Sequence, residues 1–447
     1  MERITRPCLD LEWKSFEIAM NSLGLASSNA ALTEQMFLRD KPGHRLFLLF
    51  QKFPVLASLW CLSIRQWRDH VAEVLQRAAK DRHALSRLDI QEPFHGAIKD
   101  IRLGLSDAHH GGRSVTLIEF NKGPRVIYKP RAGKSEAAWF SFLAWINRNG
   151  FRPKLRNPRL LPRKGYSWME YMQAAPCQNK AGVRRFYERL GGLIAAAYLL
   201  KAVDCHRENL IAAGEHPVLV DIDALWHVSP TTKAQSMHEV LYRTGFFPNA
   251  RRRSLQSRSS VLGHAQRGGH LPYIGDQSVP PGRHADAIVS GFRRAWRCVL
   301  GNAGRRAAFL RRLESMGTRE RRWIYCSTAK YGAILRASLR PAVVRSAAQR
   351  DAVVCEFSTR SGVSKSVVRA EIKALRELNI PYFNRRTRGH MPPEPKQPPS
   401  ELILAIRKAV EWAENTARPG TTLSKGDRYK SGNPRPAGPR PSHSALE

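Results

Sequence analysis

Three polar side chains in one stretch of the sequence have the types and spacing of a phosphoryl-transfer site. Asp204 and Asn209 lie five positions apart, and Asp221 follows twelve residues later, after the apolar run Val-Leu-Val. Phosphoryl transfer needs a carboxylate to accept the proton of the attacking hydroxyl and oxygen ligands for a metal ion beside the phosphates. We therefore predict that Asp204 is the catalytic base, and that Asn209 and a strand-borne Asp221 bind Mg²⁺.

A Lys on a predicted strand could neutralise the phosphates of ATP. Residues 114–120 and 125–128 predict a β-hairpin closed by Asn-Lys-Gly-Pro, and Lys129 ends its second strand. On its own such a Lys would be a surface side chain, but the downstream polar set favours phosphate binding. Glu136 could pair with it from a helix, as a helix Glu does in kinases.

Two further segments have features of a nucleotide site. The turn that contains Gly111 and Gly112 could direct backbone N–H groups at the nucleotide. Residues 166–172 predict an apolar strand, and Glu170 and Met172 near its end would lie beside adenine. Glu170 could instead be a solvated strand end.

These motifs together resemble the dehydratase domain of class II lanthipeptide synthetases, over residues from about Pro54 to about Phe383. The matching segments are Ser-Asp-Ala-His-His-Gly-Gly at 106–112, Tyr-Lys-Pro-Arg at 128–131, Tyr-Ser-Trp-Met-Glu at 166–170, Asp-Cys-His-Arg-Glu-Asn-Leu-Ile at 204–211 and Pro-Val-Leu-Val-Asp-Ile-Asp at 217–223. The resemblance implies that Ser and Thr of a precursor peptide are phosphorylated with ATP, and that the phosphate is then eliminated to leave dehydroalanine or dehydrobutyrine. It also implies functional roles for Asp107, His109 and His206.

The resemblance implies a separate motif for elimination, an Arg and a Thr six positions apart in a helix. Arg322 and Thr328 fit it. An Arg suits this step because its guanidinium forms two parallel hydrogen bonds with a phosphate. Cys326 stands where a second Arg commonly precedes the Thr in this family, and Arg321 or Lys330 could replace that cation.

The fold that the resemblance implies is α+β, a kinase-like (lipid-kinase-like) two-lobed fold with added helices. We expect a helical N-terminal region at 1–95, the kinase-like domain at 96–383, with lobes that meet near residue 175, and a Pro/Gly-rich basic tail at 384–447 with one helix. The family's usual zinc-dependent cyclase would need Cys ligands. None follows Phe383, so we expect no cyclase here and a possible separate cyclase as partner.

The helical pattern divides the second lobe. We expect a helix at 181–203 that leads into the catalytic loop, a polar and Gly-rich loop at 247–285, and helices at 284–316 and 320–350. A last helix is expected at 400–416.

Composition limits the function classes. The seven cysteines are scattered without Cys-x-x-Cys pairs, which argues against a disulfide framework and a zinc ribbon. The start has no signal-peptide pattern, and the apolar run at 46–64 is interrupted by Gln51, Lys52 and Pro54. We therefore predict a cytoplasmic protein without a membrane partner, and a buried helix pair at 46–64.

The net charge of +37 indicates polyanionic partners or a solvated Arg-rich surface. A rival interpretation uses residues 357–380, which resemble a basic helix-turn-helix that binds DNA. The end of this segment, Glu-Leu-Asn-Ile-Pro-Tyr-Phe at 377–383, instead resembles the synthetase family. We favour a peptide partner, with its leader and core segments, over nucleic acid. A catalytically impaired peptide-binding relic is the second alternative.

Overall fold

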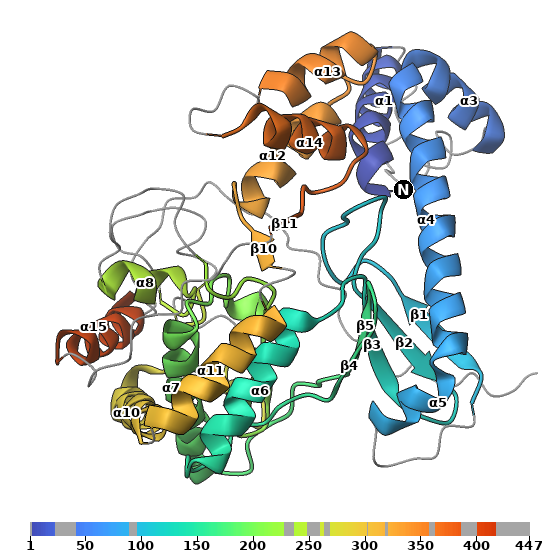
Figure 1. Cartoon of the computed structure of the whole chain (residues 1–447). Coiled ribbons are helices and arrows are strands. Elements are labelled where there is room, and N and C mark those ends of the chain that lie inside the picture. The colour runs from blue at the N-terminus through green and yellow to red at the C-terminus, as the bar shows by residue number, and fades with distance from the viewer. Residues whose placement is uncertain are drawn as a thin grey trace, which may run out of the picture.

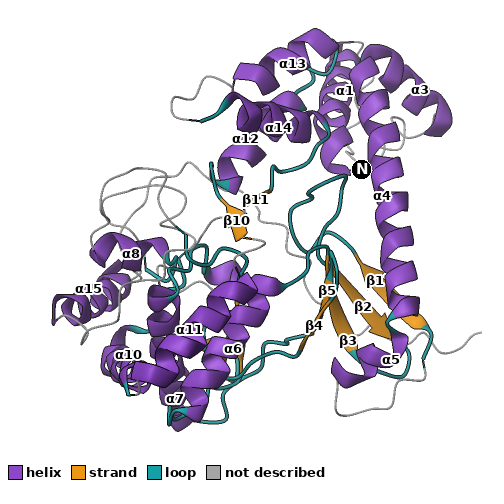
Figure 2. Ribbon diagram, in the orientation of Figure 1, coloured by secondary structure: helices purple, strands orange, loops and turns teal. Residues whose placement is uncertain are grey.

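The computed structural model describes residues 2–22, 42–88, 96–227, 237–247, 260–262, 269–301, 303–317, 321–356, 363–385 and 400–416. A twisted sheet lies on one side of the molecule, a group of long helices on the other, and further helices lie above both (Figure 1). Figure 2 shows that helices predominate and that strands gather mainly in the one sheet. The predicted α+β class is confirmed.

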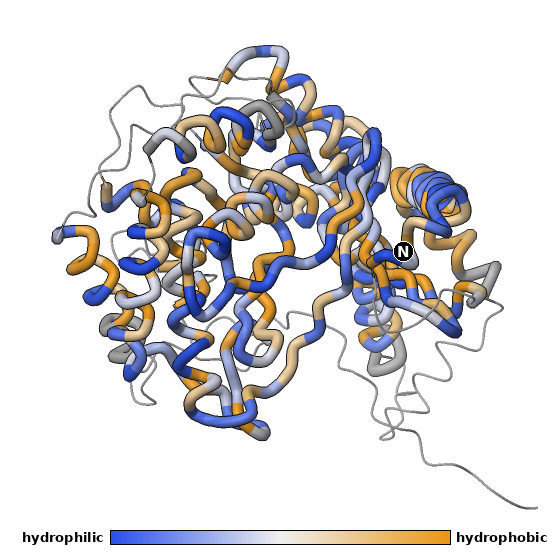
Figure 3. The backbone as a smooth tube through the Cα atoms, turned by 60° about the horizontal axis from the view of Figure 1, so that its bottom comes forward, coloured by the Kyte–Doolittle hydropathy of each residue, from blue (hydrophilic) through white to orange (hydrophobic). Residues whose placement is uncertain are grey.

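The described residues before position 89 are helical, as predicted. Their elements are α1 (Glu2–Ser22), α3 (Pro42–Lys52), α4 (Pro54–Lys80), α5 (Arg82–Leu85) and a 3₁₀ turn at Ser86–Leu88. Pro54 starts α4, where its missing N–H costs nothing. Along the helices hydrophilic and hydrophobic residues alternate (Figure 3), so most of them bury one face only.

The apolar segment at 46–64 forms two helices that are only half-buried. Leu49 and Leu56 are buried against α1, whereas Phe47 and Ile64 are exposed. Among the described residues no single helix has the length and apolar character of a membrane span. The stretch Leu46–Lys52 together with α4 meets that test as a pair, but the pair is bent by 119°.

The sheet has five antiparallel strands in the order β1-β2-β3-β5-β4: β1 (Ile98–Arg102), β2 (Thr116–Phe120), β3 (Arg125–Lys129), β5 (Ser167–Glu170) and β4 (Leu160–Pro162). The predicted hairpin is confirmed, because β2 and β3 pair directly, with Thr116 opposite Tyr128. The strand predicted at 166–172 is shorter and ends at Glu170.

Alternation along β3 determines which way Lys129 faces. Val126 and Tyr128 pack in a cluster with Val74 of α4, whereas Ile127 belongs to the main core with α6 (Lys134–Arg148) and α7 (Lys180–Leu199). Successive side chains of a strand point to opposite faces, so Lys129 shares the face of Ile127. That face is turned toward α6 and α7.

The part of the molecule that was predicted as the second lobe is built on α7 and α10 (Ala285–Leu300), which cross at very short distance. A Cβ at Gly191 would lie 2.0 Å from the Ile288 carbonyl oxygen, and a Cβ at Gly291 would lie 1.8 Å from that of Glu188. Only glycine permits such backbone contact. The remaining elements of this lobe are the 3₁₀ turn Arg207–Asn209, β6 (Leu210–Ala213), β7 (His216–Leu219), α8 (Met237–Arg243), β8 (Tyr273–Ile274), β9 (Gln277–Ser278), the 3₁₀ turn Gly282–His284, α11 (Ala303–Gly317) and α15 (Ser400–Thr416).

Helix α15 was predicted as part of a tail, but its apolar face packs into the main core. Leu402, Ile406 and Val410 are buried there. Residues 417–447 lie outside the described residues, as do 248–259 and 263–268 of the loop predicted at 247–285.

The prediction of one helical stretch at 320–350 is wrong. This segment begins with the strand β10 (Arg321–Trp323), which pairs with β11 (Phe383–Arg385), and continues into α12 (Thr328–Ser338) and α13 (Ala347–Cys355). Helix α14 (Lys365–Arg376) follows residues 357–362, which lie outside the described part. The turn of the proposed helix-turn-helix is therefore untested.

Candidate active site

A buried ion pair lies at the end of β3, beside the segment that follows β7. Lys129 Nζ at the end of β3 lies 3.1 Å from Glu136 Oε1 on α6, and the two side chains are 2% and 1% exposed. Lys129 also donates a hydrogen bond to the carbonyl oxygen of Val220. A fully desolvated pair is stable only with close geometry and further hydrogen bonds, and both are present here.

The loop after α7 holds Asp204 between two neighbours. His206 Nε2 lies 3.4 Å from Asp204 Oδ1, and Asn209 Nδ2 donates to the Asp204 carbonyl oxygen at 2.9 Å. Asp204 has a φ of 69°, a left-handed conformation that costs free energy for a residue with a Cβ. The backbone conformation that orients this carboxylate therefore lowers the stability of the loop.

Asp221 and Asp223 follow β7 instead of lying on it, which corrects the prediction of a strand-borne Asp221. The Val220 N–H donates to the Asn209 carbonyl oxygen at 2.9 Å, so this segment runs beside the loop that carries Asp204. Asp221 Oδ1 lies 3.9 Å from Lys129 Nζ.

Arg322 reaches the same group from β10. Its Nη1 lies 3.5 Å from Asp204 Oδ2 and 3.4 Å from Asp223 Oδ2, and its N–H donates to the Asp223 carbonyl oxygen at 3.2 Å. The prediction that Arg322 and Thr328 share a helix is wrong, because Arg322 is on a strand and Thr328 is the first residue of α12. Within the described residues, the Thr328 hydroxyl forms no hydrogen bond with Arg322 or Asp204.

The turn at 106–112 is bound to the C-terminal segment. His109 Nδ1 lies 2.7 Å from the Ile380 carbonyl oxygen, and the Gly112 N–H donates to Asn379 Oδ1 at 2.8 Å. Asp107 lies in the same turn, where its carbonyl oxygen accepts a hydrogen bond from Ser106.

Gly111 and Gly112 have φ of 81° and 83°, and a Cβ at Gly112 would lie 2.6 Å from Gln66 of α4. Backbone conformation and close packing therefore require glycine here, and the approach of this turn to a nucleotide stays a prediction.

Glu170 and Met172 do not join the charged group. Glu170 Oε1 lies 2.9 Å from Arg156 Nη2, and its other oxygen accepts a hydrogen bond from the Arg159 N–H at 3.0 Å. Met172 is buried with Ala213 and Val218. Both side chains have structural roles here, and their proximity to adenine stays a prediction.

Cys326 packs against an apolar cluster that contains Tyr331, Val354 and Leu375. Cys326 is only partly buried in this cluster, and its place in the position of a phosphate-binding Arg stays a prediction.

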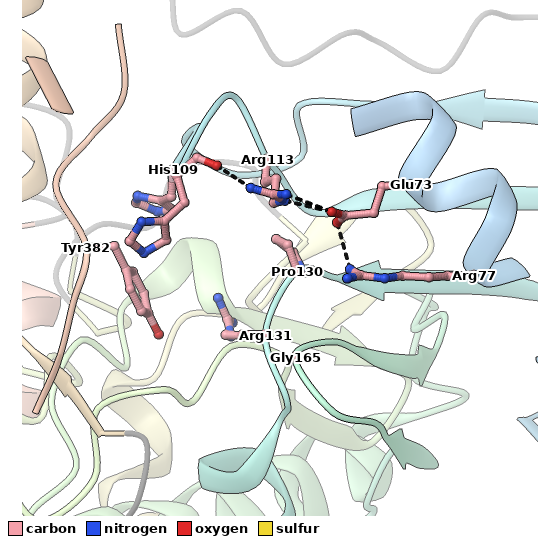
Figure 4. Close-up of a pocket in the computed structure, with 9 residues that line it drawn as sticks. Glu73, Arg77, His109, Arg113, Pro130, Arg131, Gly165 and Tyr382 are labelled. Carbon is pink, nitrogen blue, oxygen red and sulfur yellow. Dashed lines mark hydrogen bonds and ion pairs between the residues drawn. The ribbon is translucent and has the colours of Figure 1, made fainter. Parts of the chain in front are cut away.

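A cavity of about 250 Å³ adjoins the charged group. In Figure 4 His109, Arg131 and Tyr382 lie at one end of it, and Glu73 and Arg77 lie at the other. Its remaining lining residues are His110, Arg113, Pro130 and Gly165. Glu73 accepts hydrogen bonds from Arg77 at 2.6 Å and from Arg113 at 2.9 Å, so much of this cationic charge is already paired.

Burial and ion pairing shift the pKa values of the central groups. Burial raises the pKa of Asp221, but Arg131 and Lys129 outweigh burial and hold that pKa at about 2. Burial raises the pKa of Asp223 above its ordinary value, and the Asp221 charge acts in the same direction. Burial lowers the pKa of His109 to about 4, so its imidazole is neutral near pH 7.

Asn209 and Asp221 supply the oxygen atoms that Mg²⁺ prefers. Among the described residues, no group of three or more His, Cys, Asp and Glu is arranged to hold a metal ion. Mg²⁺ with one or two protein ligands and phosphate oxygens is the common arrangement in nucleotide sites, so the residue types fit. The carboxylate of Asp221 is, however, in contact with Arg131.

Two residues of this charged group, Arg131 and Asp223, were not predicted as site residues. Arg131 contacts Asp221 and lies 3.6 Å from Asp223 and 3.2 Å from Glu136. The available signals were the Arg that follows Lys129 and Pro130, and the Asp-Ile-Asp spacing that places two carboxylates in one loop.

Comparison with known proteins matches residues 53–269 and 263–386 to a domain of unknown function, DUF4135. The chain is also 23% identical over 384 residues to the lacticin 481/lactococcin biosynthesis protein LcnDR2 of Lactococcus lactis subsp. lactis. The aligned part covers 74% of this chain and 41% of that relative, so the chain spans less than half of the relative's length.

Proposed function

The chain belongs to the DUF4135 domain family, and from this premise we propose that it dehydrates Ser and Thr residues of a lanthipeptide precursor. The hydroxyl is first phosphorylated with ATP, and the phosphate is then eliminated. The similarity to a lacticin 481 biosynthesis protein supports peptide modification as the broader role.

One observation carries the proposal. A strand Lys and a helix Glu form a buried pair beside Asp221, and Asp204, Asn209 and Arg322 converge on the same place from distant parts of the sequence. Kinases use a Lys–Glu pair of this kind, a base on a loop, and Asn and Asp ligands for the metal. This combination also supports a kinase-like, two-lobed fold.

In the first step Asp204 accepts the proton of the substrate hydroxyl. The hydroxyl oxygen bonds to the γ-phosphorus of ATP while the bond between that phosphorus and ADP breaks. His206, 3.4 Å from Asp204, holds the carboxylate in position for this transfer. Lys129 neutralises phosphate charge. Mg²⁺ held by Asn209 and Asp221 would supply further neutralisation of the phosphates.

In the second step the Cα proton passes to a basic group or to water, the electron pair of the Cα–H bond forms the Cα–Cβ double bond, and the Cβ–O bond breaks so that phosphate leaves. Arg322 is the cation that stabilises the departing phosphate. Because Arg322 lies 3.5 Å from Asp204, both steps use one site.

The test is to incubate the protein with the precursor peptide encoded near its gene, ATP and Mg²⁺, and to record the peptide mass. We expect dehydrated peptide, with phosphorylated peptide at early times. A folded protein that binds the peptide without any mass change would contradict the proposal and favour the catalytically impaired relic. Reactions without ATP are the control.

A further inference from the structure

Arg131 is the most heavily engaged cation of the site. It follows β3 by two residues, and its side chain is 16% exposed. Its Nε lies 3.2 Å from Glu136 Oε1 and its Nη1 lies 3.6 Å from Asp223 Oδ2, while Nη2 is in contact with Asp221 Oδ1. One guanidinium therefore contacts three carboxylates.

In this arrangement the Arg131 guanidinium contacts the carboxylate of Asp221, which is a proposed ligand of the metal ion. Asp221 Oδ1 is the atom that contacts both Arg131 and Lys129. A carboxylate oxygen that accepts a charged hydrogen bond is a weaker ligand for a divalent cation, because part of its charge is already neutralised. The guanidinium and a Mg²⁺ ion on Asp221 would also repel each other at short distance.

The balance of charges in the whole group also indicates that Arg131 takes the place of a metal ion. The carboxylates are those of Glu136, Asp204, Asp221 and Asp223, and the cations are Lys129, Arg131 and Arg322. Without Arg131 the group would have four carboxylates and two cations, and buried carboxylates left without a partner are costly. Arg131 thus supplies the positive charge that the site would otherwise take from a metal ion.

A displaced Arg131 guanidinium would have space beside it, because Arg131 lines the cavity of about 250 Å³.

We propose that Arg131 is an internal counter-cation that competes with the metal ion for Asp221. It holds the carboxylates in place before the metal binds, and it releases Asp221 when the metal arrives. This inference rests on the proposed function for the metal site at Asp221, and it assigns Arg131 a positioning role in metal loading.

The test uses Mn²⁺ alone as the probe, without ATP or peptide, and measures free Mn²⁺ by electron paramagnetic resonance. Arg131→Gln should bind Mn²⁺ about tenfold to a hundredfold more tightly than wild type, the range that the loss of one charged hydrogen bond implies. Arg131→Lys keeps the charge but cannot reach all three carboxylates, so its affinity should fall between the two. Arg102→Gln, which removes an exposed Arg 2.8 Å from Asp100 on the same sheet, should leave Mn²⁺ affinity unchanged.

Equal or weaker Mn²⁺ binding by Arg131→Gln, or no binding at millimolar Mn²⁺, would overturn the inference. If Arg131→Gln does not fold, Arg131→Lys decides, since unchanged affinity in that variant also contradicts competition. Failure of the proposed function would appear separately, as wild-type protein that never changes the mass of the peptide.

Discussion

Asp204 is held by contacts from two sides, with His206 at 3.4 Å and Arg322 at 3.5 Å. Asp204→Asn keeps the shape of the side chain but cannot accept the substrate proton. We expect the phosphorylation rate to fall about 10²–10⁴-fold, the usual contribution of a general base. Phosphopeptide formation measured in single turnovers checks this, and Asp100→Asn, an exposed Asp on β1, should keep the wild-type rate. A rate for Asp204→Asn within threefold of wild type would exclude its role as base.

Elimination can be separated from phosphorylation most cleanly at Thr328. Arg322→Ala would remove the partner of Asp204 as well, so both steps would slow. Thr328→Ala, in contrast, removes a hydroxyl at the start of α12 and should let phosphorylated peptide accumulate. Thr328→Ser keeps the hydroxyl and should restore the dehydrated product. An unchanged ratio of dehydrated to phosphorylated peptide in Thr328→Ala would show that this residue has no part in elimination.

The buried pair should dominate local stability. Glu136→Gln leaves Lys129 charged and almost fully buried, so we expect a loss of about 3–5 kcal/mol in the free energy of unfolding. Asp351→Asn breaks the Arg376 pair, whose side chains are 49% and 47% exposed, and should cost less than about 1 kcal/mol. Urea unfolding at pH 7 measures both. Equal losses for the two variants would show that burial does not set the strength of these pairs.

At the residue scale, the sequence predicted those candidate site residues that the chemistry places at a fixed distance from each other along the chain. Asp204 and Asn209 lie in one short loop, so their separation along the chain already limits their distance in space. Arg131 and Asp223 were missed because their partners come from other elements, and an ion pair between distant segments leaves no local pattern. The Gly111–Gly112 pair meets a backbone requirement that the sequence alone did not reveal, and its approach to a nucleotide stays a prediction.

The α7–α10 contact makes a prediction at the scale of elements. In Gly291→Ala the added methyl group would lie 1.8 Å from the Glu188 carbonyl oxygen, so the helices must separate. We expect a loss of at least about 1–3 kcal/mol in the free energy of unfolding. Gly304→Ala on α11 has nothing within 4 Å of its new Cβ and should stabilise the protein by up to about 1 kcal/mol. Chemical denaturation measures both, and a stable Gly291→Ala variant would mean that α7 and α10 lie farther apart.

Elements with local signals were predictable and those with distant partners were not. The hairpin of β2 and β3 has its turn residues between two apolar runs, and α7 has a long apolar face. Strand β10 has only three residues, and its partner β11 lies some 60 residues later, so no periodicity could reveal it. This strand carries Arg322, to which we assign the stabilisation of the departing phosphate.

At the scale of the whole molecule, the net charge of +37 is not a property of the candidate active site. The central group has four carboxylates and three Lys or Arg side chains. This group therefore has no cationic excess, and the positive net charge comes from other parts of the protein. An acidic partner would be attracted by the protein surface as a whole, with an affinity that falls as salt is added.

Buried histidines should make the whole protein sensitive to mild acid. Burial lowers the pKa of His109, His216, His227 and His270 from 6.5 to about 4 in each case. The unfolded chain takes up these protons near pH 6.5 and the folded protein does not, so stability is lost as the pH falls from about 6.5 to about 4. Each fully buried His contributes at most about 3 kcal/mol to this loss. Asp221 does not contribute in this range, because its folded pKa of about 2 lies below its unfolded value of 3.8 and its stabilisation is lost only at lower pH.

His270→Gln tests this origin of acid sensitivity. His270 is 4% exposed, and its buried Nε2 has no hydrogen-bond partner among the described residues, so a neutral Gln removes the proton uptake with little change in volume. The free energy of unfolding should then fall less steeply between pH 6.5 and pH 4 than in wild type, by up to about 3 kcal/mol over the window. His83→Gln, at an exposed position of α5, should keep the wild-type slope. Identical slopes for all three proteins would mean that His270 does not contribute to the acid sensitivity of the protein.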